Sequence, residues 1–268
     1  LCRAYGYAGI ICAGPMILGV VLLAGMSMVA RIAGMPAHER ELMNCMLTYS
    51  LLVSLSVTSW FNMIATRYVS DMLYEEKPEK VMPSFYGCCA IMLAVGDILY
   101  GCFLFFSGVP LLHQLLCLLF SAVLIVVWTQ MIYLTALKDY RGIILAFTIS
   151  LMDYFPKSQG SRLSFLGWFD RYPSLAFIGG FVNLGLFAHL VIMYFGPLRV
   201  QVEGLFYGAP SYDVPALTAF FSILVTTVNF VTSVEVRFYP TYRNYYSLFN
   251  DKGSIRDIEQ AEEEMLTV

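Results

Sequence analysis

Residues 111–137 read LLHQLLCLLFSAVLIVVWTQMIYLTAL, a stretch that contains no Lys, Arg, Asp or Glu. A helix of about 20 apolar residues is long enough to cross a bilayer core of about 30 Å, so this stretch predicts a transmembrane helix. Five more long apolar runs predict the same structure, at 5–30, 45–66, 85–106, 174–196 and 214–236. With a shorter apolar run at 142–152, they predict an all-α, multi-pass transmembrane helical bundle of six full spans and one short segment.

Composition agrees with a membrane protein. Hydrophobic residues make up 59% of the chain and charged residues 13%, whereas a soluble domain carries about 25% charged residues. The net charge of −3 does not indicate nucleic-acid binding, because charge in a membrane protein matters by its position, and no nucleic-acid partner is expected. The seven cysteines show no CxxC or Cys/His ligand spacing, so they predict packing residues rather than a metal or redox site.

Basic residues orient the predicted spans. Lys and Arg are retained on the cytoplasmic side during membrane insertion. If the N-terminus is cytoplasmic and the short run does not change sides, the outside keeps only Arg31, Arg40 and Arg199, so 13 of the 16 basic residues lie inside. This asymmetry predicts a cytoplasmic N-terminus.

The short run at 142–152 conflicts with this orientation. Arg141 before it and the basic segment 157–171 after it are both expected in the cytoplasm, yet the run is too short to cross the membrane even once. It could be a shallow re-entrant segment, a short helix buried among its neighbours, or the remnant of a helical hairpin missing from this chain. No Gly or Pro lies between Ile143 and Tyr154 to form a re-entrant tip, which favours the missing hairpin.

Several segments resemble a known family beyond their hydropathy. In chain order they are RAYGYAGIICAG (3–14), ATRYVSDMLY (65–74), Pro83-Ser84, ALKDYRGIILAF (136–147), FDRYPSLAFIG (169–179), NLG (183–185), YDVP (212–215) and IRDIEQAEEEML (255–266). With these segments the chain resembles PelG, the inner-membrane component of the Pel exopolysaccharide export system. That family belongs to the superfamily of multidrug, oligosaccharidyl-lipid and polysaccharide exporters.

The resemblance implies an exporter- or flippase-like fold with more spans than this chain contains. The chain is therefore expected to be a fragment that lacks both family ends and part of a hairpin near 151–153. The expected organisation is an N-terminal helical bundle (1–152), a cytoplasmic loop (153–173), two further spans (174–238) and a cytoplasmic amphipathic tail helix (239–268). In that tail helix, Ser254 with Asp257 resembles a capping box.

The resemblance also implies a function and partners. The protein is expected to lie in the bacterial cytoplasmic (inner) membrane and to pass a nascent Pel-like polysaccharide across it. A cytosolic glycosyltransferase, other membrane subunits of the export complex and membrane lipids are the expected partners. No cofactor, metal or catalytic residue is expected.

Ionisable and polar residues within spans are the candidate transport-path residues, because burying them in a membrane is unfavourable without a function. Asp97 could bind a cation, a proton or sugar groups, or it could fix helix contacts. His189 could line a cavity and titrate near neutrality, or pack structurally. The family pattern commonly has an Asp-Lys pair at His189-Leu190, and this chain departs from it. The remaining path candidates are Asn183, Asn229, Trp60 and Glu235.

A basic-aromatic-acidic group ends the run at 45–66. Arg67, Tyr68 and Asp71 could receive an emerging polysaccharide at the cytoplasmic mouth of the bundle. The alternative is a snorkelling Arg67 that forms an i,i+4 ion pair with Asp71.

A second function within the superfamily is the alternative hypothesis: a lipid-linked oligosaccharide flippase or a cation-coupled multidrug exporter. A flippase needs basic cavity residues for a pyrophosphate, and the spans offer almost no interior Lys or Arg, which favours polysaccharide export. A membrane glycosyltransferase would need clustered carboxylates, and no DxD motif occurs in the chain. The chain is therefore not expected to be an enzyme.

Overall fold

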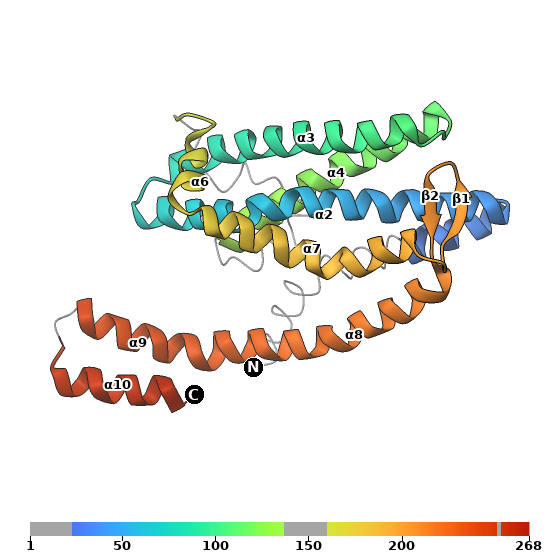
Figure 1. Ribbon diagram of the computed structural model, residues 1–268. Coiled ribbons are helices and arrows are strands. Elements are labelled where there is room, and N and C mark those ends of the chain that lie inside the picture. Colours follow the sequence, from blue (N-terminus) through green and yellow to red (C-terminus); the bar gives the residue numbers. More distant parts are fainter. Residues whose placement is uncertain (1–22, 137–159, 251–252, 268) are drawn as a thin grey trace. The chain divides into compact units, whose positions relative to one another are not determined.

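The computed structural model describes residues 23–136, 160–250 and 253–267. Within them, four helices are long and apolar enough to cross a membrane (Figure 1). These helices are α2 (Ala37–Tyr74), α3 (Val81–Phe106), preceded by the short 3-10 turn Pro78–Lys80, α4 (Leu111–Ala136) and α7 (Pro173–Phe195). They confirm the predicted spans at 45–66, 85–106, 111–137 and 174–196.

The prediction of six complete spans is not supported. The run at 5–30 lies mostly outside the described residues, and its described part is only a shorter apolar helix, Leu23–Ile32. That helix ends because Gly34 adopts a left-handed φ of 70° and the Met35 N–H bonds back to the Ala30 carbonyl, a common helix C-terminus. The short run at 142–152 and the expected break at 151–153 lie outside the described residues.

The sixth predicted span, 214–236, forms most of α8 (Pro210–Ser233), which is not among the four candidate spans. It continues without interruption through a π turn, Val234–Phe238, into α9 (Tyr239–Asn250). Pro240 explains the wider turn, because proline lacks an N–H and its ring collides with the carbonyl four residues earlier. The apolar run is thus part of a longer helix that ends in a polar, tyrosine-rich segment.

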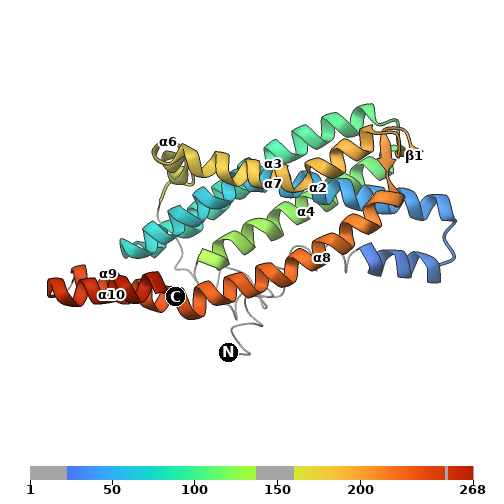
Figure 2. The ribbon, with the colours of Figure 1, turned by 60° about the horizontal axis from the view of Figure 1, so that its bottom comes forward.

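The first unit, Gly19–Asp213, is a bundle centred on α2, which packs against α3, α4 and α7 (Figures 1 and 2). Small residues allow neighbouring helices of the bundle to approach closely. A Cβ at Gly96 would lie 2.6 Å from Ile125, and one at Gly179 would lie 2.5 Å from the Ser59 carbonyl oxygen. Close approach of this kind lets helices pack through dispersion forces where lipid provides no hydrophobic drive.

Hydroxyl groups on α2 are buried inside this bundle. Ser50 lies 3.1 Å from the Tyr100 hydroxyl, and the Trp128 indole N–H donates to Ser54 at 3.1 Å. The hydroxyl of Thr58 bonds to the backbone carbonyl one turn earlier. Each of these buried polar groups therefore has a partner, as the interior of a membrane bundle requires.

A short antiparallel β-hairpin, β1 (Val200–Glu203) and β2 (Phe206–Gly208), is the only β structure among the residues that the structure describes. It turns at Gly204, whose φ is 54°. The alternation of Val200 and Val202 before a glycine is the sequence signal for a strand and turn, although the hairpin was not predicted.

The second unit includes Val214–Val268. Beyond α8 and α9 it contains α10 (Ile255–Thr267), which packs beside α9 (Figure 1). Ser254 caps α10: its hydroxyl accepts a hydrogen bond from the Asp257 N–H at 3.2 Å and donates one to the Asp257 carboxylate at 2.7 Å. The predicted N-cap at Ser254 is confirmed, and Asp257 bonds the Ser254 hydroxyl rather than the backbone N–H of a full capping box. The division of the chain into four regions stays a prediction.

Candidate functional site

Arg67, Tyr68 and Asp71 lie on the last turns of α2, where another part of the chain covers them. Arg67 and Asp71 form the i,i+4 ion pair that was the structural alternative, with Nε 3.0 Å from Oδ1. Asp71 also accepts a hydrogen bond from the Trp168 indole N–H at 2.8 Å. The Tyr68 hydroxyl lies 2.8 Å from the Ser164 hydroxyl. The three residues therefore anchor a segment almost 100 residues further along the chain.

This segment, residues 161–172, is called the clasp below. It contains a 3-10 turn (Ser164–Leu166) and the short helix α6 (Gly167–Arg171). Trp168 packs edge-on against Tyr68, with ring centroids 4.8 Å apart, and the Arg67 guanidinium lies 5.5 Å from the Tyr172 ring centre. These contacts join α2 to the FDRYP motif. The sequence did not predict that these two segments interact.

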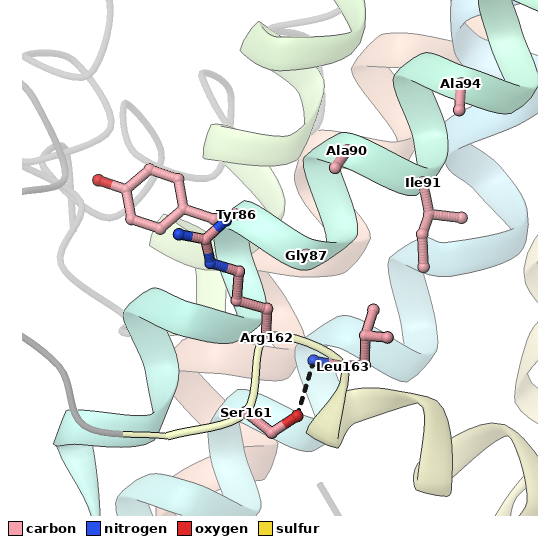
Figure 3. Close-up of a pocket in the computed structure, with 8 residues that line it drawn as sticks. All are labelled: Tyr86, Gly87, Ala90, Ile91, Ala94, Ser161, Arg162 and Leu163. Carbon is pink, nitrogen blue, oxygen red and sulfur yellow. Dashed lines mark hydrogen bonds between the residues drawn. The ribbon is translucent and has the colours of Figure 1, made fainter.

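The clasp also crosses α3. A Cβ at Gly87 would collide with the Arg162 carbonyl, so only glycine lets the clasp pass this close. Beside this crossing lies a pocket of about 540 Å³ (Figure 3). Its walls are formed by one stripe of α3 and the start of the clasp: Tyr86, Gly87, Ala90, Ile91, Ala94, Ser161, Arg162 and Leu163.

Asp97 lies in the centre of α3, and its side chain is exposed within the described bundle. It is seven residues, about two helical turns, from Ala90, which is exposed, and from Leu104, which is buried at 1% exposure. Asp97 thus occupies the border between the packed and open faces of α3. An ionisable residue at such a depth usually faces a water-filled cavity or another protein group.

Trp60 and Asn183 lie at the contact between α2 and α7. The Trp60 ring packs directly on Gly180, where a Cβ would lie 2.5 Å away, and edge-on against Phe177 and Phe181. The Asn183 amide donates to the Gly179 carbonyl one turn earlier at 3.3 Å. The structure therefore gives both residues packing contacts between helices.

His189 lies near the other end of α7, in contact with the first turn of α8. Its ring is 5.8 Å from that of Tyr212, at an interplanar angle of 64°. The adjacent Asp213, which precedes the sixth predicted span, accepts a hydrogen bond from the Ala209 N–H at 3.1 Å. Burial raises the pKa of the Asp213 carboxyl, while Ala209, the Tyr194 hydroxyl and His189 act in the opposite direction. Tyr212 and Asp213, the first two residues of the YDVP motif, thus lie beside His189.

The β-hairpin covers this same end of the bundle. The Tyr49 hydroxyl donates to the Tyr207 carbonyl at 3.1 Å and accepts from the Tyr207 N–H at 3.3 Å. The Tyr49 ring stacks between Phe103 and Tyr194, with centroids 5.6 and 5.7 Å away. We call this arrangement the hairpin cap. It was not predicted, because no sequence signal pairs residue 49 with residue 207.

The two remaining path candidates lie in the second unit. Asn229 is on α8 with an exposed side chain, and Glu235 belongs to the π turn, with its side chain outside the described part. Across the described residues, no group of three or more His, Cys, Asp and Glu side chains could hold a metal ion.

Comparison with known proteins gives one match. The family model PelG, "Putative exopolysaccharide Exporter (EPS-E)", matches residues 1–152 and 148–268, which together cover the chain. No curated protein and no solved structure matches. The matching model describes an exporter family and not an enzyme family.

Proposed function

Because the chain belongs to the PelG family of exopolysaccharide exporters, we propose that it passes a nascent Pel-like polysaccharide across the bacterial cytoplasmic membrane. A cytosolic glycosyltransferase supplies the polymer, and other membrane subunits complete the complex. The N-terminus faces the cytoplasm, which places the clasp on the inside and the hairpin cap on the outside. The basic residues of the clasp support this orientation.

The exposed position of Asp97 is the observation that most directly supports the proposed path. A carboxylate exposed at the centre of a span-length helix is costly in hydrocarbon, and it becomes tolerable where water or a polar ligand reaches it. A Pel-type polymer, rich in N-acetylhexosamine with some free amines, would supply hydroxyl and ammonium donors to such a group. The border of α3 that carries Asp97 therefore forms one wall of the path.

The other polar candidates are proposed path residues as well. His189, Asn183, Asn229 and Glu235 would contact sugar hydroxyl groups as the polymer passes, and Trp60 would offer an aromatic ring for stacking. At the cytoplasmic mouth, Arg67 and Asp71 would receive the polymer at the edge of the clasp, while Tyr68, which is 1% exposed, would hold the clasp beside them. The exposed Arg67 is the group in this set with the most freedom to contact a ligand, since its side chain is 51% exposed.

The charge distribution favours a polysaccharide over a lipid-linked substrate. The four candidate spans contain three Lys or Arg residues, Arg40, Arg67 and Lys80, all near the ends of their helices. A pyrophosphate-linked lipid would require basic groups deeper in the membrane to neutralise its charge. We expect transport without an enzymatic step.

Deletion of the gene tests the export role. Secreted polymer should fall to background in the deletion strain, and plasmid-borne expression of the intact gene should restore it. Polymer should be quantified separately in the medium and in the cells, with the glycosyltransferase level measured as a control. Unchanged secretion in the deletion strain would refute the proposed function.

A further inference from the structure

We propose that the pocket between α3 and the clasp binds one anionic phospholipid of the cytoplasmic leaflet. Its apolar floor would hold part of an acyl chain, and Arg162 would bind the phosphate. This site goes beyond the export function, and its assignment to the cytoplasmic leaflet rests on the orientation proposed above.

The shape of the pocket suits a chain molecule. Its floor follows α3 through Gly87, Ala90 and Ala94, and Ile91 and Leu163 form an apolar edge (Figure 3). Small residues at successive turns leave a shallow channel along the helix. The volume of about 540 Å³ lies within the range of small-molecule sites, roughly 300–1,000 Å³.

Beyond the pocket, the open side of α3 exposes large apolar side chains. Further along the open side of α3, Ile98 is 65% exposed and Phe105 is 77% exposed. Large apolar side chains exposed on a span-length helix fit contact with acyl chains. Asp97 lies at the border of this surface and does not line the pocket.

Charge selects the headgroup. Arg162 is the only permanently charged residue of the eight that line the pocket, and none of the eight is acidic. A guanidinium binds phosphate oxygens with paired hydrogen bonds, and basic pockets at the cytoplasmic ends of spans suit anionic lipids. The same charge disfavours a polymer with free ammonium groups as the occupant.

The clasp holds this wall in place before a ligand arrives. The crossing at Gly87 fixes the backbone at Arg162, and the Tyr68–Ser164 and Trp168–Asp71 hydrogen bonds fix the backbone that follows it. A preformed wall lowers the entropy lost on binding.

Native mass spectrometry of the full chain in detergent tests the site. Phosphatidylglycerol and phosphatidylcholine are added in equal amounts, and the retained lipid is counted for wild type and variants. Wild type should retain phosphatidylglycerol preferentially, and R162Q should lower that preference about fivefold, the effect of about 1 kcal/mol per interfacial arginine. The control R171Q changes an exposed arginine of the same clasp outside the pocket and should keep the preference.

A second variant tests the floor. Ala94→Trp fills the channel from an exposed position and should reduce retention of both lipids. Unchanged preference in R162Q would overturn the proposal, as would an equal loss in R171Q, which would indicate a diffuse basic belt. Normal lipid retention with blocked secretion in Ala94→Trp would assign the pocket to the polymer and also overturn it.

Discussion

The hairpin cap and the clasp close opposite ends of the bundle with different chemistry. In the cap, neutral aromatic rings stack around Tyr49, and its hydroxyl satisfies both backbone groups of Tyr207. In the clasp, a carboxylate, a guanidinium and indole and hydroxyl donors form a partly exposed network. The cap therefore resembles a buried seal, whereas the clasp leaves charged groups available to ligands.

Each end depends on one glycine that lies against a carbonyl, and these glycines give the largest expected effects. Gly204→Val in the cap collides with Ser107 and also forces a β-branched residue into a left-handed φ. Gly87→Val collides with Arg162 but keeps helical φ. We expect the free energy of unfolding to fall by about 3–5 kcal/mol in Gly204→Val and by about 1–3 kcal/mol in Gly87→Val.

Thermal unfolding of the purified variants in detergent, followed by intrinsic fluorescence, tests which variant is less stable. A midpoint for Gly87→Val below that of Gly204→Val would contradict the expectation that the left-handed φ at Gly204 makes the cap the more sensitive of the two positions.

Removal of one tyrosine hydroxyl from each end gives the next largest effect. Tyr49→Phe leaves the N–H and carbonyl of Tyr207 without their partner. We therefore expect the free energy of unfolding to fall by about 1–3 kcal/mol. Tyr68→Phe removes a hydroxyl pair with Ser164, worth about 0.5–1.5 kcal/mol. The thermal unfolding midpoints of the two variants test this ranking. Equal midpoints would contradict the expected difference in stability between the two ends.

Trp168→Phe should loosen the clasp alone. Phenylalanine keeps part of the ring contact with Tyr68 but loses the hydrogen bond to Asp71. This loss should lower the free energy of unfolding by about 1 kcal/mol. Limited proteolysis should then cut residues 161–172 faster than in wild type and residues 200–208 at the wild-type rate. Faster cleavage at both ends would show that cap and clasp are coupled.

Arg67→Gln should have the smallest effect on stability. Its ion pair with Asp71 is exposed, so we expect less than about 1 kcal/mol. Secretion should nevertheless fall if the residue receives polymer at the mouth. Stability and secretion that both match wild type would leave Arg67 with only its ion pair.

The sequence predicted what depends on local composition. Four spans followed from apolar runs such as 111–137, and the α10 cap followed from Ser254 and Asp257. The Arg67–Asp71 pair followed from helical spacing. The Tyr49–Tyr207 and Asp71–Trp168 contacts could not be predicted, because they join residues distant in the chain. Helix limits beyond the apolar runs were also missed, since α2 extends from Ala37 to Tyr74, well past 45–66.

Secretion by an Asp97→Asn strain tests the proposed path most directly. The substitution keeps the size of the side chain and removes its charge, and Asp170→Asn changes an exposed carboxylate of the clasp as the matched control. At equal protein levels, secreted polymer should fall about tenfold or more in Asp97→Asn, as expected when a hydrogen bond to a charged group is lost. Secretion in the Asp170→Asn strain should match wild type. Wild-type secretion by the Asp97→Asn strain would contradict the account.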